Sequence, residues 1–146
     1  MTLLRALAVA VVVAATALTF RPVLDHGFLN WDDPPVALHP RLAEPPAALA
    51  AWAFTTTDMQ HYQPLAWLAY GALATAGDRA AAVHTTSVAL HLLNVALLFW
   101  LTTRILAGRD DDGDWWIPAA TTALFAVHPM RVEPVAWASA LPYLLS

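Results

Sequence analysis

Residues 83–106 read VHTTSVALHLLNVALLFWLTTRIL, and no formal charge lies between Arg79 and Arg104. A helix of this length reaches roughly 36 Å, because each residue adds about 1.5 Å. The hydrocarbon core of a bilayer is about 30 Å thick. The sequence therefore predicts a membrane-spanning helix over residues 83–106.

Two further apolar stretches predict additional membrane segments. Residues 1–20 read MTLLRALAVAVVVAATALTF with a single charge, Arg5, and predict a retained span over residues 3–20. The alternative is a secretory signal peptide with a cleavage site at residues 15–17. A shorter apolar stretch predicts a third segment over residues 115–128. The expected fold class is all-α, with two to three spans of a polytopic membrane protein.

The placement of arginine predicts the orientation of these spans. Arg104 and Arg109 flank a short acidic loop, and basic residues favour the cytoplasmic side whereas acids count for little. Residues 108–114 are therefore expected to face the cytoplasm. The polar residues of the first outer loop and of the segment from residue 128 onward should then converge on the opposite side.

Residues 21–82 are expected to form a mixed, partly helical loop outside the cytoplasm. Residues 45–54 open with prolines, which suit the first turn of a helix. Residues 64–76 predict a second short helix that cannot cross a bilayer and is expected to lie in the membrane interface. Residues 1–146 then form the N-terminal part of a multi-pass membrane domain, and this piece is not expected to be active alone.

Composition excludes several classes of function. The chain is 59% hydrophobic and 12% charged, contains no lysine and carries a formal net charge of -4. A soluble domain usually carries about a quarter charged residues, and nucleic-acid binding requires a basic patch. The absence of cysteine removes disulfides and thiolate metal sites. We expect a protein of the cell membrane, with membrane lipids and no nucleic acid among its partners.

The first polar cluster is Asn30-Trp31-Asp32-Asp33-Pro34, which follows the first span. Adjacent carboxylates near a membrane surface repel each other in a low dielectric, so their proton affinities should differ. That arrangement suits one carboxylate as a base and the other as a ligand or neutral donor. Pro34 favours an extended backbone at Asp33, which would present the pair to solvent. The alternative interpretation is an ordinary turn.

Further polar residues enter the later helices. His61 and Tyr62 precede the short helix expected from residue 64, as functional residues or as an aromatic anchor. His84, His91 and Asn94 share one face of the second span, because spacings of seven and three return to the same side. Polar residues within a membrane are functional candidates, and a structural hydrogen bond to a neighbouring helix is the equal alternative.

The last cluster is His128-Pro129-Met130-Arg131-Val132-Glu133-Pro134, at the expected outer end of the third segment. It contains the second glutamate of the chain. An ion pair between Arg131 and Glu133 is the alternative to a functional role.

Taken in order, these clusters resemble the N-terminal part of the C-type (GT-C) membrane glycosyltransferases related to protein O-mannosyltransferases. The nearest likeness is to the branch often fused to tetratricopeptide repeats. The resemblance covers nearly the whole chain and rests on residues 30–33, Trp52, Phe54, residues 62–65, His84, residues 91–94 and residues 128–137. The chain departs from the family pattern at Ser87, where asparagine is usual, and at residues 140–143, where relatives carry a basic stretch.

The resemblance implies transfer of a sugar from a polyprenyl-phosphate donor to an acceptor hydroxyl, on protein Ser/Thr or a glycan. Asp32 or Asp33 would be the general base, and Glu133 would support it electrostatically. The substrate-binding residues would be His61, Tyr62, His84, His91, Asn94, His128 and Arg131. Among these, His61, His128 and Arg131 suit the leaving phosphate. No cofactor or metal ligand set is predicted, although two carboxylates and a glutamate would suit a divalent cation.

Two other functions remain open on the sequence alone. One is a non-catalytic assembly or transport subunit of a membrane complex. The other is a haem- or metal-binding membrane subunit with His84 and His91 as ligands, which requires partner histidines on another span.

Overall fold

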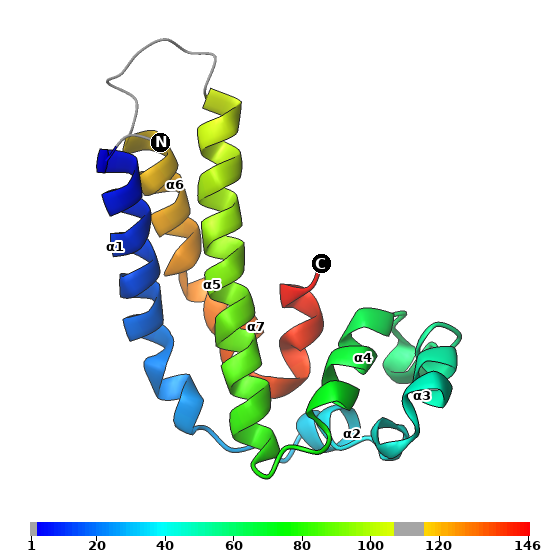
Figure 1. The fold of residues 1–146 in the computed structure, drawn as a ribbon. Coiled ribbons are helices and arrows are strands. Elements are labelled where there is room, and N and C mark those ends of the chain that lie inside the picture. Colours follow the sequence, from blue (N-terminus) through cyan, green and yellow to red (C-terminus); the bar gives the residue numbers. More distant parts are fainter. Residues whose placement is uncertain (1–2, 107–115) are drawn as a thin grey trace.

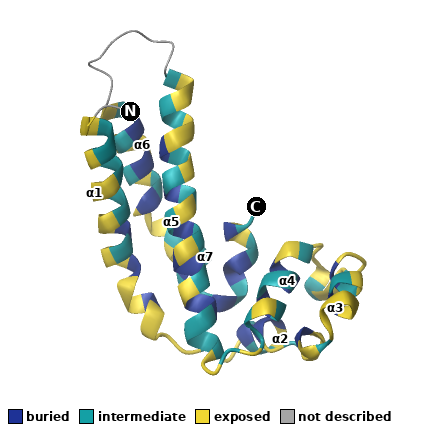
Figure 2. Ribbon diagram, in the orientation of Figure 1, coloured by how far each residue is buried: buried dark blue, intermediate teal, exposed yellow. Residues whose placement is uncertain are grey.

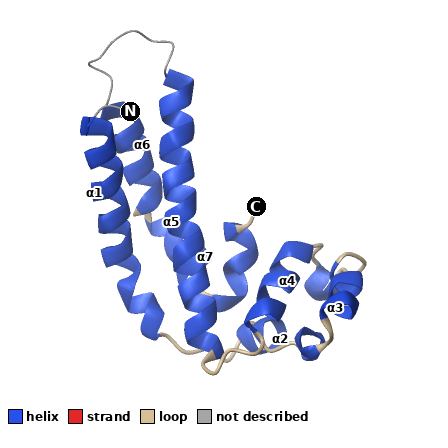
Figure 3. Cartoon of the chain, in the orientation of Figure 1, coloured by secondary structure: helices blue, strands red, loops and turns tan. Residues whose placement is uncertain are grey.

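The structure is a computed structural model that describes residues 3–106 and 116–146 (Figure 1). Every regular element in these residues is a helix (Figure 3), so the all-α fold class is confirmed. The predicted cytoplasmic loop, residues 108–114, lies outside the described residues.

Three helices pack side by side and alternate in direction (Figure 1): α1 (Leu3–Phe20), α5 (Arg79–Leu106) and α6 (Trp116–Ala126). Two helical stretches are long and apolar enough to cross a membrane by length and composition: Leu3–Asp25, with mean hydropathy 2.2, and α5, with 1.6. Helix α6 has 11 residues, which is roughly 16 Å of rise. It is therefore too short for the third span expected over residues 115–128.

Local chemistry explains where α5 begins and ends. Asp78 Oδ1 accepts a hydrogen bond from the Ala81 N–H at 3.0 Å, which satisfies one of the free donors at a helix start. Arg104 lies in the last turn, where a positive charge interacts favourably with the negative end of the helix dipole. The helix starts at Arg79 rather than at residue 83 because this capping aspartate precedes it.

The expected outer loop is partly helical, as predicted. It contains α2 (Asp33–Ala37), η2 (Pro40–Ala43), α3 (Pro46–Ala53), η3 (Asp58–Gln60) and α4 (Pro64–Leu73). Prolines occupy the first turns of four of these five helices, where the missing N–H costs nothing because it would be unpaired anyway. The short helices form a separate group beside the bundle (Figure 1).

Aromatic residues form the core of this group. Trp67 and Tyr70 of α4 are fully buried, and the Trp67 ring lies 5.0 Å from the Trp52 ring of α3. A Cβ atom at Gly71 would clash with the end of the Leu49 side chain, so glycine allows α3 and α4 to approach closely with Leu49 in this position. Helix α4, expected in the membrane interface, thus turns its aromatic face into the protein.

The chain after α6 turns back against α5 and closes the fold. It forms η5 (Pro129–Arg131), α7 (Val132–Ala136) and η6 (Ala138–Leu144). Leu141 packs into the core of the short helices between α1 and α5, whereas Leu144 packs with the end of α1. Helix η6 therefore joins the two parts of the molecule. Four of its residues, Ala138, Ala140, Leu141 and Leu144, are buried, and Figure 2 shows dark blue, buried residues in this last segment of the chain.

Candidate functional site

A pocket of about 730 Å³ lies among α2, the start of α4, α7 and η6. This volume is within the range of small-molecule sites in proteins. Four of the residues proposed from sequence line it, namely Asp32, His61, Tyr62 and Glu133. The structure thus gathers members of three polar clusters that are far apart in the sequence.

Neither carboxylate of the pocket forms an ion pair with another described residue. Asp32 directly precedes α2 and is half-buried, and Glu133 lies exposed in the first turn of α7. Among residues 3–106 and 116–146, the ion pairs join His39 to Asp58 and Arg41 to Glu44. The alternative of an Arg131–Glu133 pair is therefore not realised. Both carboxylates remain available to accept a proton from a ligand.

Asp33 has a different role from its neighbour. Its side chain is 1% exposed, and its two oxygens accept hydrogen bonds from the Leu29 N–H and the Ser139 N–H, each at 2.8 Å. The expectation of an extended, presented Asp33 is wrong, because Asp33 is the first residue of α2 and faces η6. Proline is tolerated in a first helical turn. Asp33 therefore anchors the pocket wall, and Asp32 faces the pocket.

Tyr70 holds the same wall from α4. Its hydroxyl donates a hydrogen bond of 2.7 Å to the Ala138 carbonyl, next to the residue that Asp33 holds. Burial, with a smaller contribution from the Asp33 carboxylate, raises the pKa of Tyr70 far above its ordinary value. The hydroxyl consequently stays protonated and serves as a permanent donor.

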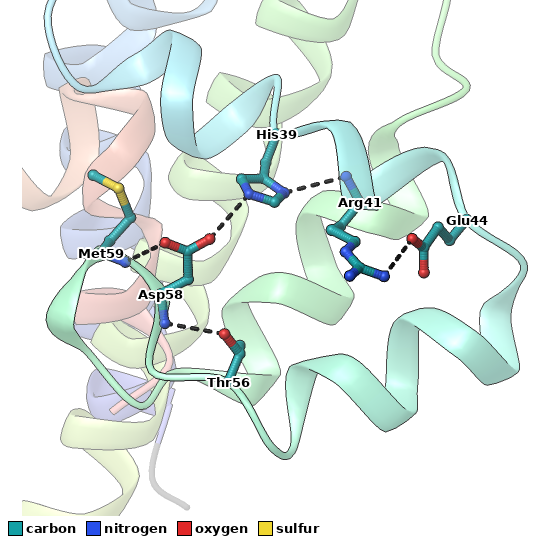
Figure 4. A network of polar contacts seen from close by, with 6 residues as sticks. All are labelled: His39, Arg41, Glu44, Thr56, Asp58 and Met59. Atoms are coloured by element: carbon teal, nitrogen blue, oxygen red, sulfur yellow. Dashed lines mark hydrogen bonds and ion pairs between the residues drawn. The ribbon is translucent and has the colours of Figure 1, made fainter.

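A polar network sets the chain direction into His61 and Tyr62 (Figure 4). Met59 and Gln60 have φ of 55° and 61°, a left-handed conformation that costs a non-glycine residue about 1–2 kcal/mol. Asp58 stabilises this bend, because Oδ1 accepts from the Met59 N–H at 2.8 Å and Oδ2 lies 3.0 Å from His39 Nε2.

The imidazole of His39 is itself fixed on both sides. Its Nδ1 accepts from the Arg41 N–H at 3.2 Å, so the ring proton that meets Asp58 is on Nε2. The ring also stacks on Trp52, with centroids 5.0 Å apart and planes 17° apart. His39 and Asp58 thus couple the aromatic core to the bend that positions His61.

Asp58→Ala should lower the free energy of unfolding by about 1–2 kcal/mol, because one capping bond and one partly exposed pair are lost. Chemical unfolding in mixed micelles measures the change. Thr57→Ala is the matched control, since Thr57 is exposed and its side chain caps nothing. Equal stability of the two variants would show that the network does not support the bend.

The polar face of α5 is used within the protein. His91 is buried, and its Nε2 lies 2.9 Å from the Ala126 carbonyl, where it donates to a free oxygen at the end of α6. Asn94 Nδ2 donates to the Leu144 carbonyl at 2.9 Å. His84 is buried with its ring 6.0 Å from that of His26. These residues are not among those that line the pocket.

His128 and Arg131 also lie outside the pocket lining. His128 Nδ1 accepts from the Met130 N–H at 3.2 Å and so caps η5. The Arg131 guanidinium lies 4.9 Å from the centroid of the Phe125 ring, a favourable cation–π distance. The structure therefore does not place either residue beside Asp32 as a contact for a leaving phosphate.

Sequence reasoning missed the residues of the opposite wall. Ser139 and Tyr143 of η6 line the pocket together with Trp137. Ser139 and Tyr143 lie in or next to residues 140–143, where the chain departs from the pattern of the family that it resembles, whereas Trp137 ends the last stretch that carries the resemblance. Within the described ranges, no group of three or more His, Cys, Asp or Glu could hold a metal ion.

Comparisons with protein-family models, with curated proteins and with solved structures found no match.

Proposed function

We propose that this chain belongs to a membrane enzyme that transfers a sugar from a polyprenyl-phosphate donor to an acceptor hydroxyl, outside the cytoplasm. The observation that carries the proposal is the convergence of Asp32, His61, Tyr62 and Glu133 on one pocket. Asp32, Tyr62 and Glu133 come from the motifs that resemble those of the C-type glycosyltransferases, and His61 directly precedes one of these motifs. A pocket with an unpaired carboxylate is what activation of a hydroxyl requires.

The surface of α1 supports a place in the membrane. Leu3, Leu7 and Leu18 are 85%, 59% and 71% exposed, and only 11% of the apolar window of this helix is buried inside the protein. A core helix of a soluble protein would bury these side chains, because exposing a large apolar patch to water is unfavourable. Lipid is the surrounding that accommodates such a helix.

The proposed reaction assigns a role to each carboxylate. Asp32 takes the proton of the acceptor hydroxyl, and the resulting oxygen attacks the anomeric carbon of the donor. The bond between that carbon and the phosphate oxygen breaks, and polyprenyl phosphate leaves with the electron pair. Glu133 stabilises the positive charge that develops on the sugar as this bond stretches. Asp32 then releases its proton to water.

The test is a transfer assay with the full-length protein reconstituted in liposomes. Polyprenyl-phosphate hexoses are supplied as donors, with glycans and Ser/Thr peptides as acceptors, and nucleotide sugars serve as negative controls. Transfer that requires the lipid-linked donor supports the proposal. A correctly folded protein without transfer from any such donor would favour the non-catalytic assembly or transport subunit.

The orientation is tested with residues 1–146, whose sequence contains no cysteine. Asp25 is exposed and ends the helical turn Arg21–Asp25, which follows α1. The C-terminal end of α1 and the start of α6 lie at opposite ends of the bundle (Figure 1). A cysteine at position 25 should react with a membrane-impermeant maleimide in intact cells. A cysteine at Gly113 should react only after the membrane is opened. The reverse pattern would invert the proposed topology.

A further inference from the structure

The charge of the pocket bears on which substrate enters it. Among the described residues, the pocket lining contains two carboxylates, Asp32 and Glu133, one imidazole, His61, and no arginine or lysine. Within the described part of the chain, neither carboxylate is neutralised by an ion pair. Arg131 is the basic residue nearest to Glu133 in the sequence, but its guanidinium lies over the Phe125 ring and not in the pocket lining. An anionic group in this pocket would meet like charges without a compensating cation.

The other lining groups suit a neutral, hydroxyl-rich molecule. Tyr62 and Tyr143 are 62% and 64% exposed at the pocket, and Trp137 adds a third aromatic side chain. Flat aromatic faces pack against the C–H faces of pyranose rings. Carboxylates accept hydrogen bonds from sugar hydroxyls, and Gln63 and Ser139 supply further donors and acceptors.

We propose that this pocket is a subsite for a neutral carbohydrate acceptor and that it excludes the phosphate of the donor. The acceptor role rests on the proposed transferase function, whereas the preference for neutral sugar over phosphate is a property of the pocket itself. The phosphate of the donor stays outside the pocket. Only the sugar of the donor approaches Asp32 and the acceptor bound there. A protein hydroxyl acceptor would need an extended peptide groove, and the aromatic lining favours a sugar ring.

The test compares sugars that differ only in charge. Neutral methyl hexosides and the matched hexose 6-phosphates are titrated against the full-length protein in lipid nanodiscs, with binding followed by ligand-observed NMR. Nanodiscs are used because glycoside detergents would compete for the site. The neutral sugars should bind at least about tenfold more tightly than their phosphates.

Charge variants locate the effect. In Asp32→Asn/Glu133→Gln the preference for neutral sugars should shrink, because the repelling charges are gone. Asp25→Asn/Glu44→Gln removes two acids that do not line the pocket and should keep the preference. Tyr143→Ala should weaken binding of both sugars, which separates stacking from charge.

Several outcomes would overturn the proposal. Equal or tighter binding of the phosphates would show that the pocket accepts the anionic donor group. Binding of a Ser/Thr peptide but of no hexoside would identify a protein acceptor, and binding of neither would remove the subsite. Neutral-sugar binding without transfer in the liposome assay would instead reject the transferase function and leave the carbohydrate site standing.

Discussion

Asp32→Asn should lower sugar-transfer turnover by about 10²–10⁴-fold, the usual contribution of a positioned general base. Asparagine keeps the shape of the side chain but cannot take the acceptor proton. The Asp32 carbonyl, which accepts from the Val36 N–H at 3.2 Å, is retained, so α2 should still form. The measurement is the initial rate of transfer from a polyprenyl-phosphate hexose by equal amounts of reconstituted protein.

Two companion variants make the result specific. Asp25→Asn removes an exposed acid outside the pocket and should keep turnover near wild type. Glu133→Gln should reduce turnover less than Asp32→Asn, because Glu133 acts only through its charge. A loss as large as that of Asp32→Asn would instead indicate that both carboxylates share a bound cation. Near wild-type turnover in Asp32→Asn would remove Asp32 from the reaction.

The long helices could be predicted from the sequence because their signal is local. Residues 3–20 and 83–106 are apolar over a length that reaches across a bilayer, and no distant contact is needed to recognise them. The shortness of the third segment could also be predicted, because its apolar stretch is itself short. Its apolar stretch continues to Val127, but the helix ends at Ala126, where His91 of another helix meets the final carbonyl.

The candidate site could be predicted only in part. The polar clusters identified Asp32, His61, Tyr62 and Glu133, because carboxylates and aromatic residues stand out in an apolar chain. The roles of two adjacent aspartates could not be separated, since the donor that distinguishes Asp33 is the Ser139 N–H, 106 residues away. A sequence does not show which backbone N–H group will bind a given side chain, because nearly every residue has one. The bend at Met59 and Gln60 could not be predicted either. The Asp58 carboxylate that stabilises it is held by His39, which is distant in the sequence.

Asp33→Ala should lower the free energy of unfolding by about 3–6 kcal/mol, because two hydrogen bonds to a charged acceptor are each worth about 1.5–3 kcal/mol. The Leu29 and Ser139 N–H groups would lose their acceptor in a part-buried setting. Such a loss is a large share of the 5–15 kcal/mol that stabilises a typical protein. Chemical unfolding in mixed micelles at neutral pH measures it.

Asp33→Asn should cause a smaller loss of stability than Asp33→Ala. It also distinguishes a structural role of Asp33 from a role as general base. One amide oxygen can still accept a bond, whereas the amide nitrogen would face a backbone donor, so about half of the loss is expected.

Tyr70→Phe removes the neighbouring bond to Ala138 and should cost about 1 kcal/mol. Because both residues hold the first turn of helix η6, their effects should be non-additive in a double-mutant cycle. If Asp33 is an anchor, turnover of Asp33→Asn should follow its folded fraction and recover at lower temperature. A fully folded Asp33→Asn with turnover as low as that of Asp32→Asn would show that Asp33 takes part in the chemistry.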